Sequence, residues 1–125
     1  MALHELTLDK IEHFTLLATT TITDVGDQTG VDLAGYEGDV QIILSGTAAG
    51  AAADLTFRIE ESADDVTYTA ATGGTFTAIG NAAYKEVLTL NSNDLKRYVR
   101  LSCTAKTGSP SSAVTCFGFG LKKYG

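Results

Sequence analysis

The sequence predicts an all-β protein, an antiparallel β-sandwich of about eight short strands, on three observations. From residue 13 onward, apolar and polar residues alternate with the period of two that marks a half-buried strand. Gly, Asn, Asp and Ser interrupt this alternation roughly every 8–12 residues, a spacing typical of sandwiches and small barrels. No stretch between these turns has a convincing helical period, which argues against parallel βαβ units. Jelly-roll and immunoglobulin-like strand orders both fit this spacing, so the choice between them stays open.

Most of the expected strands are defined by this alternation and end at a glycine or an acidic turn. The clearest has Leu55, Phe57 and Ile59 on one face and polar residues at the positions between them. The acidic pairs at 60–61 and 64–65 indicate the solvated tip of a hairpin, because the spacing of a calcium-binding loop is absent. The expected strands cover residues 16–23, 31–33, 40–45, 55–60, 66–69, 76–79, 83–90, 98–105 and 113–121.

Residues 1–20 are expected to form an N-terminal arm or a first strand, and residues 21–125 a single β-sandwich domain. The first residues include an acid and a histidine where a secretory signal carries basic residues, and no continuous apolar segment follows. We therefore expect synthesis in the cytoplasm without export. The longest charge-free stretch, 66–84, is rich in Thr and Gly and unsuited to a bilayer, so no membrane partner is expected.

The last two expected strands, 98–105 and 113–121, are joined through a Gly-Ser-Pro turn and are expected to pair as a hairpin. The preferred register places Phe117 and Phe119 on its buried apolar face, because burial sets the register of a strand pair. Both cysteines are then expected to be buried free thiols, the usual state in a chain that is not exported.

Few residues in the sequence support chemistry, so we expect neither catalysis nor a cofactor. The two histidines, His4 and His13, have no metal-ligand spacing to another His or Cys. The serine-hydrolase elbow, the phosphate-binding loop and the dinucleotide fingerprint are all missing. Nine Lys and Arg against fifteen Asp and Glu give a formal charge of −6, which disfavours nucleic acid as a partner. The absence of Trp weakens a glycan-binding interpretation.

A dense basic cluster, KRYVR at 96–100, has two interpretations. It is either a docking site for an acidic surface on a partner, or an outward strand face that offsets Glu60, Glu61 and Glu86. The sequence leaves both open.

Three blocks of the sequence carry a resemblance to a known family when taken in order: VDLAGYEG at 31–38, LTFRIEESADDVTYT at 55–69 and LKRYVRL at 95–101. Together with the last apolar strand they resemble the decoration or cement proteins of tailed-bacteriophage heads, over about residues 30–121. This resemblance implies a non-enzymatic virion protein, made in the host cytoplasm, that binds the assembled capsid lattice and stabilises it. It also implies the major capsid protein as partner, the capsid surface as location and self-association as a trimer or dimer.

We expect the capsid contact to combine the N-terminal segment with the basic late strand, because an arm and a compact sandwich together reach two neighbouring subunits. An alternative of the same fold is a phage tail or neck protein, or a module that binds glycans on the host surface. The candidate contact residues are His4, Leu6, Leu8, Ile11, Phe14, Lys96, Arg97, Tyr98 and Arg100.

Overall fold

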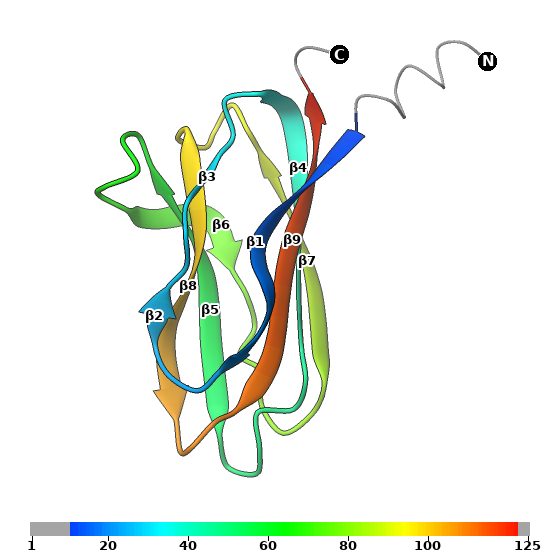
Figure 1. Ribbon diagram of the computed structural model, residues 1–125, viewed down its shortest axis with the longest axis vertical. Coiled ribbons are helices and arrows are strands. Elements are labelled where there is room, and N and C mark those ends of the chain that lie inside the picture. Colours follow the sequence, from blue (N-terminus) through cyan, green and yellow to red (C-terminus); the bar gives the residue numbers. More distant parts are fainter. Residues whose placement is uncertain (1–10, 123–125) are drawn as a thin grey trace, which may run out of the picture.

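The computed structural model describes residues 11–122, which form nine strands in two antiparallel sheets (Figure 1). One sheet has four strands in the order β1-β9-β4-β7, and the other has β2-β8-β5-β6 with β3 also paired to β8. The all-β sandwich that the sequence predicts is confirmed. The strands are β1 (Ile11–Ile22), β2 (Gly26–Asp27), β3 (Val31–Asp32), β4 (Tyr36–Gly46), β5 (Asp54–Ser62), β6 (Thr69–Thr75), β7 (Tyr84–Asn91), β8 (Tyr98–Thr107) and β9 (Ser112–Lys122).

The core lies between the two sheets and follows the alternation in the sequence. Every second residue of the central strands is fully buried, which is the pattern of a strand with one solvated face. Burial of each large aliphatic side chain contributes on the order of 2 kcal/mol to the free energy of unfolding. This core is therefore the main source of the protein's stability. Its central members are Val40, Ile42 and Leu44 of β4, Leu55, Phe57 and Ile59 of β5, Val99 and Leu101 of β8, and Val114 and Cys116 of β9.

Strand β1 is an edge strand that pairs with β9 along its length. The register shifts between Thr15 and Leu17 and again between Leu17 and Thr20. These irregularities let two consecutive residues, Leu16 and Leu17, both reach the core. Residues 11–20 of the expected arm or first strand are therefore part of the four-stranded sheet, while residues 1–10 lie outside the described part.

The expected hairpin between the last two strands is wrong, because β8 and β9 belong to different sheets. Strand β8 pairs with β5, β2 and β3, whereas β9 lies between β1 and β4. In this position β9 turns Val114 and Cys116 into the core and Phe117 and Phe119 outward. The prediction of two buried free thiols nevertheless holds, because Cys103 and Cys116 are both buried and unpaired.

Two further expected strands differ in part from the structure. Residues 66–68 lie in a turn and its exit, and the strand that follows, β6, begins at Thr69. Residues 76–79 run beside β5 but join it only through an isolated bridge from Ile79 to Leu55 and a hydrogen bond from the Phe76 amide to the Phe57 carbonyl. Within the described range there is no helix with the length and apolarity that a membrane crossing needs.

Candidate interaction surfaces

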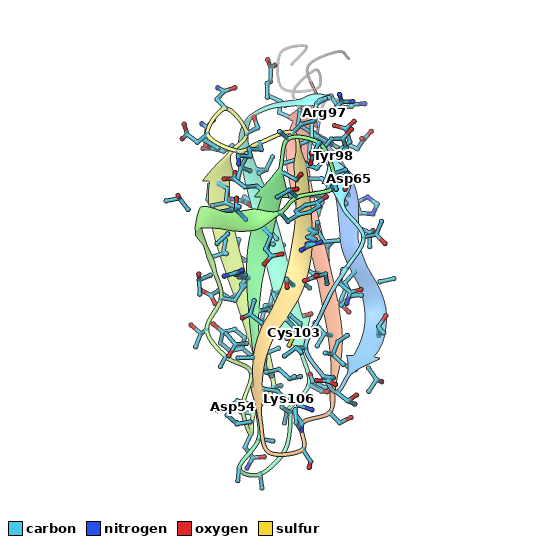
Figure 2. The ribbon with its side chains drawn as sticks, turned by 90° about the vertical axis from the view of Figure 1, so that its left-hand side faces the viewer. Asp54, Asp65, Arg97, Tyr98, Cys103 and Lys106 are labelled. Carbon is cyan, nitrogen blue, oxygen red and sulfur yellow. The ribbon has the colours of Figure 1, made fainter. Side chains whose placement is uncertain are left out.

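The structure brings the two segments expected to contact a partner to one end of the sandwich, which we call the β1 end. Ile11, at the start of β1, is 47% exposed there. Tyr36 connects the segments: its hydroxyl donates to Glu12 Oε1 at 2.8 Å, and the same residue lines a hollow with Lys96 and Arg97. Figure 2 shows Arg97 and Tyr98 near this end and Lys106 at the opposite one.

Arg97 holds the turn that follows β3. Its Nε and Nη2 donate to the two carboxylate oxygens of Asp32 at 3.0 and 2.8 Å, a bidentate geometry. Asp32 Oδ1 also accepts from the Ala34 amide at 2.9 Å, and the Leu33 amide donates to the Arg97 carbonyl at 2.7 Å. The Arg97 guanidinium and the Ala34 amide lower the pKa of Asp32 below its usual value. The pair is exposed, so it positions this turn more than it stabilises the fold.

Lys96 is the basic residue of the cluster that remains available to a partner. Its backbone amide donates to Glu61 Oε1 at 3.1 Å, which fixes the chain at this point. Its ammonium group forms no ion pair with any residue in the range 11–122. Lys122 also lies at the β1 end, 4.0 Å from Glu12 Oε2.

Arg100 lies on the outer face of the five-stranded sheet and is committed to contacts within the chain. Its Nε donates to Glu60 Oε1 at 2.9 Å, and its Nη2 forms ion pairs with Glu60 Oε1 at 2.8 Å and with Asp27 Oδ2 at 3.2 Å. Its guanidinium stacks over the Tyr68 ring at 4.0 Å. Arg100 therefore offsets Glu60, as one of the two interpretations of the basic cluster holds, and is poorly placed to bind a partner.

Phe14, another candidate contact residue, packs inside the sandwich. It is 7% exposed, and its ring centroid is 5.3 Å from that of Tyr36. Its role is to anchor the edge strand β1. Of the remaining candidates, Tyr98 is half-buried beside Arg97, whose guanidinium is 5.1 Å from its ring centroid. His4, Leu6 and Leu8 lie outside the described residues.

A second surface is the outer face of the four-stranded sheet, which the sequence does not predict because its expected hairpin buries Phe117 and Phe119. Phe119 is 38% exposed, and the rings of Phe117 and Phe119 pack edge to face with their centroids 5.7 Å apart. The sequence does hold a signal for this face. The alternate positions of β9 are the small residues Val114, Cys116 and Gly118, which suit the crowded core better than the two phenylalanines between and after them. Cross-strand pairing defines two adjacent rows: His13, Phe119, Gln41 and Thr89, then Thr15, Phe117, Ile43 and Val87.

A metal centre needs several ligating side chains that converge on one point. Within residues 11–122 no three His, Cys, Asp or Glu side chains come together in such a group. The described surface thus offers two kinds of contact, a mixed-charge end and an uncharged sheet face.

Comparisons with known proteins show the fold and assign no family. No family model matches the sequence, and no curated protein does. Among solved structures, the SPBc2 prophage-derived protein YomS aligns with a TM-score of 0.57 at 11% identity, over 90% of this chain and 93% of that one.

Two longer proteins contain a similar domain. The PBSX exported protein XepA aligns with a TM-score of 0.51 at 19% identity, over 91% of this chain and 38% of XepA. Infectious bursal disease virus, Gx strain, aligns with a TM-score of 0.51 at 11% identity, over 91% of this chain and 32% of the viral one. This chain thus spans roughly a third of each. The β-sandwich is therefore a fold that this protein shares with phage-derived and viral proteins.

Proposed function

We propose that this protein is a structural component of a virion that binds the assembled capsid of a tailed bacteriophage and stabilises it. In this proposal its partner is the major capsid protein and its location is the capsid surface. It acts by binding, without catalysis, nucleic acid or membrane. The sequence blocks that resemble phage decoration proteins support the proposal, and so does a fold shared with prophage-derived and viral proteins.

The observation that carries the proposal is the meeting of the two expected contact segments at the β1 end. Glu12 and Lys96 are 84 positions apart in the sequence, yet Tyr36 relates them: it hydrogen-bonds Glu12, and it lines the same hollow as Lys96. An exposed Ile11 and a Lys96 ammonium without an ion pair to residues 11–122 give this end an apolar contact and a charge, the usual parts of a small protein interface.

Stabilisation then follows from mass action. A protein that binds the assembled shell and not its separated subunits shifts the equilibrium toward the shell by its binding free energy at every site. Many copies on one lattice add these contributions, so a modest contact at each site is sufficient.

The test is cosedimentation of the purified protein with empty capsids of the phage whose genome encodes it, against host cells and host polysaccharide as competing partners. We expect binding to capsids and a rise in capsid melting temperature. Lys96→Glu should weaken capsid binding, because it reverses the available charge at the β1 end. Lys106→Glu is the control: it also removes an ion pair with Asp24 at 3.2 Å, but Lys106 lies at the opposite end, so capsid binding should be unchanged.

Binding to cells or polysaccharide but not to capsids would favour the host-surface alternative and overturn the proposal. If the two lysine variants change capsid binding equally, the protein can still be a capsid-binding protein, but the β1 end is not its binding site. Circular dichroism of both variants ensures that a lost interaction is not a lost fold.

A further inference from the structure

We propose that the outer face of the four-stranded sheet is an interface between two copies of this chain, stacked face to face about a two-fold axis that runs across the strands. This inference goes beyond the proposed function, because it concerns a different surface from the β1 end. It stands on the composition of the face, on the placement of its charges and on its size.

The centre of the face is uncharged and partly apolar. The two central rows contain no Asp, Glu, Lys or Arg, although they cross all four strands. Val87 is 47% exposed and Phe119 38% exposed, and both lie on this face. Surfaces of monomeric proteins usually interrupt such a patch with charge, and an uninterrupted one marks a contact. An uncharged centre is also compatible with itself, as a two-fold interface requires.

Charges flank this centre with opposite signs at its two ends. Toward the β1 end stand two exposed acids of β4, Glu37 and Asp39. Toward the other end stands Lys85, an exposed residue at the start of β7 that pairs with Ser45 of β4. The Lys85 side chain forms no ion pair within the described residues.

A two-fold axis across the strands reverses the direction of one copy relative to the other. It keeps each strand over its own counterpart and brings the acidic end of one copy over the basic end of its partner. Midway along β4 between Asp39 and Ser45 is Ile42, which lies between the two uncharged rows. The same axis thus matches the opposite charges and centres the apolar patch on itself.

The other face-to-face arrangement, with the axis along the strands, is less favourable. It lays the acidic end of one copy over the acidic end of its partner, so Glu37 and Asp39 would meet carboxylates and Lys85 would meet none. Like charges facing each other at an interface cost binding free energy, so the charge pattern selects the reversed arrangement.

The size of the face sets the expected strength. Four strands about 4.8 Å apart over a length of roughly 25 Å give a flat area of about 500 Å² per copy. A stable interface of standard size hides about 800 Å² per partner, so this one belongs to the small class. We therefore expect a reversible dimer that dissociates at concentrations on the order of micromolar.

The test is sedimentation velocity of the whole chain over a concentration series, with a monomer-dimer equilibrium as the expected result. Val87→Glu should abolish the dimer, because it places carboxylates of both copies near the axis. The matched control is Val66→Glu, at a 78% exposed valine in the turn after β5, which should leave the equilibrium unchanged.

Charge reversal tests the arrangement itself. Lys85→Glu and Asp39→Lys should each weaken the dimer at least tenfold, and the double variant should regain most of that loss. Because the two residues lie at opposite ends of the face, restoration requires contact between copies. A monomer at all concentrations, a dimer that persists in Val87→Glu, or a double variant no better than either single one would overturn the proposal. Capsid binding is measured separately, so each proposal can fail while the other stands.

Discussion

The ring of Phe14 lies directly against the backbone of Gly118, so that a Cβ built on this glycine would stand 2.6 Å from Phe14 Cε2. The carbonyl oxygen of Gln41 would be 3.0 Å away on the other side. The space that a side chain would occupy in β9 is therefore filled by the aromatic ring that anchors β1. Two residues further along β9, Gly120 leaves space for the ring of Tyr36 in the same way.

Gly118→Ala should therefore destabilise the protein by about 2 kcal/mol, because the added methyl group displaces Phe14 from a closely packed site. For a chain of this length the expected fall in melting temperature is roughly 8 °C. Differential scanning calorimetry measures it. Gly26→Ala is the control, since a Cβ at Gly26 meets nothing within 4 Å, and it should change the stability by less than about 0.5 kcal/mol. Equal losses in both variants would contradict the packing argument.

Glu60→Gln should cost about 2 kcal/mol of unfolding free energy, measured by urea denaturation. Glu60 is 5% exposed, and both of its carboxylate oxygens accept hydrogen bonds. Oε2 accepts from Arg58 Nε at 2.9 Å and Nη2 at 2.7 Å, and Oε1 accepts from Arg100 Nε. The neutral amide leaves two guanidinium groups without their shared anion. The expected cost is below that of a fully buried pair because the Arg58 side chain is 39% exposed.

Glu37→Gln is the matched control for this change, because Glu37 is exposed and forms no hydrogen bond or ion pair with its side chain in the described part of the protein. Its unfolding free energy should stay within about 0.5 kcal/mol of the parent. A Glu60→Gln protein as stable as this control would show that the two arginines find sufficient solvation without the carboxylate.

The thiols should be unreactive in the folded protein, and they should make its stability depend on alkaline pH. Burial raises the pKa of Cys116 to about 12 and shifts that of Cys103 in the same direction. Neither should react with a disulfide reagent at pH 8 in buffer, and both should react in urea. In the unfolded chain the Cys116 thiol regains its ordinary pKa near 9. The stabilising effect of the protonated thiol is thus complete below pH 9 and lost as the pH rises toward 12.

Urea denaturation between pH 8 and pH 11 measures this loss. Tyr36 contributes in the same direction, since burial and its hydrogen bond to Glu12 raise its pKa to about 12. Cys116→Ala should be less stable at pH 8 because of the cavity, but should lose less stability with rising pH than the parent. An identical slope in the two proteins would exclude Cys116 as a source.

Asp64, in the turn after β5, should titrate below the ordinary pKa of an aspartate. Asp64 Oδ1 accepts from the amides of Thr67 and Val66, both at 3.0 Å, and from Ser62 Oγ at 2.8 Å. These hydrogen bonds, that of Thr67 foremost, lower the pKa of Asp64 below 3.8. The contribution of the carboxylate to the turn is therefore present above pH 4 and lost as the pH falls through the lowered pKa.

The amide proton shifts of Thr67 and Val66 report this titration directly by NMR. Their midpoint should lie below pH 3.8 and vanish in Asp64→Asn, which keeps an acceptor oxygen but does not ionise in this range. Asp94→Asn, at a loop aspartate remote from this turn in the sequence, should leave the midpoint unchanged. A midpoint at or above the ordinary value would contradict the hydrogen-bond network.

Most strands could be predicted because their signals are local. Expected strand 55–60 corresponds to β5 and expected strand 113–121 to β9, each within two residues at both ends. Alternation and turn residues act over a few positions, so a single sequence displays them. The segment 76–79 is expected as a strand on the same grounds, yet it joins β5 only through one isolated bridge and one hydrogen bond, beside the part of β5 that precedes its pairing with β6.

The candidate surface could be predicted only in part. The sequence singled out Lys96 and Ile11 as candidate contact residues, and both are exposed in the structure. It did not indicate the commitment of Arg97 to Asp32 or of Arg100 to Glu60. These partners lie 65 and 40 positions away along the chain. No local pattern states which acid a basic residue meets across a sheet.

The sequence by itself determined that this protein is an all-β sandwich with a buried alternating core and an acidic surface. Those properties follow from composition and from a period of two, and they hold for any order of the strands. Only the tertiary structure decided that β9 inserts between β1 and β4, which turns Phe117 and Phe119 to the outside and brings Ile11 and Lys96 to one end. The reason is that the two sides of a strand are equivalent until a neighbouring sheet covers one of them, and that neighbour is set by long-range packing.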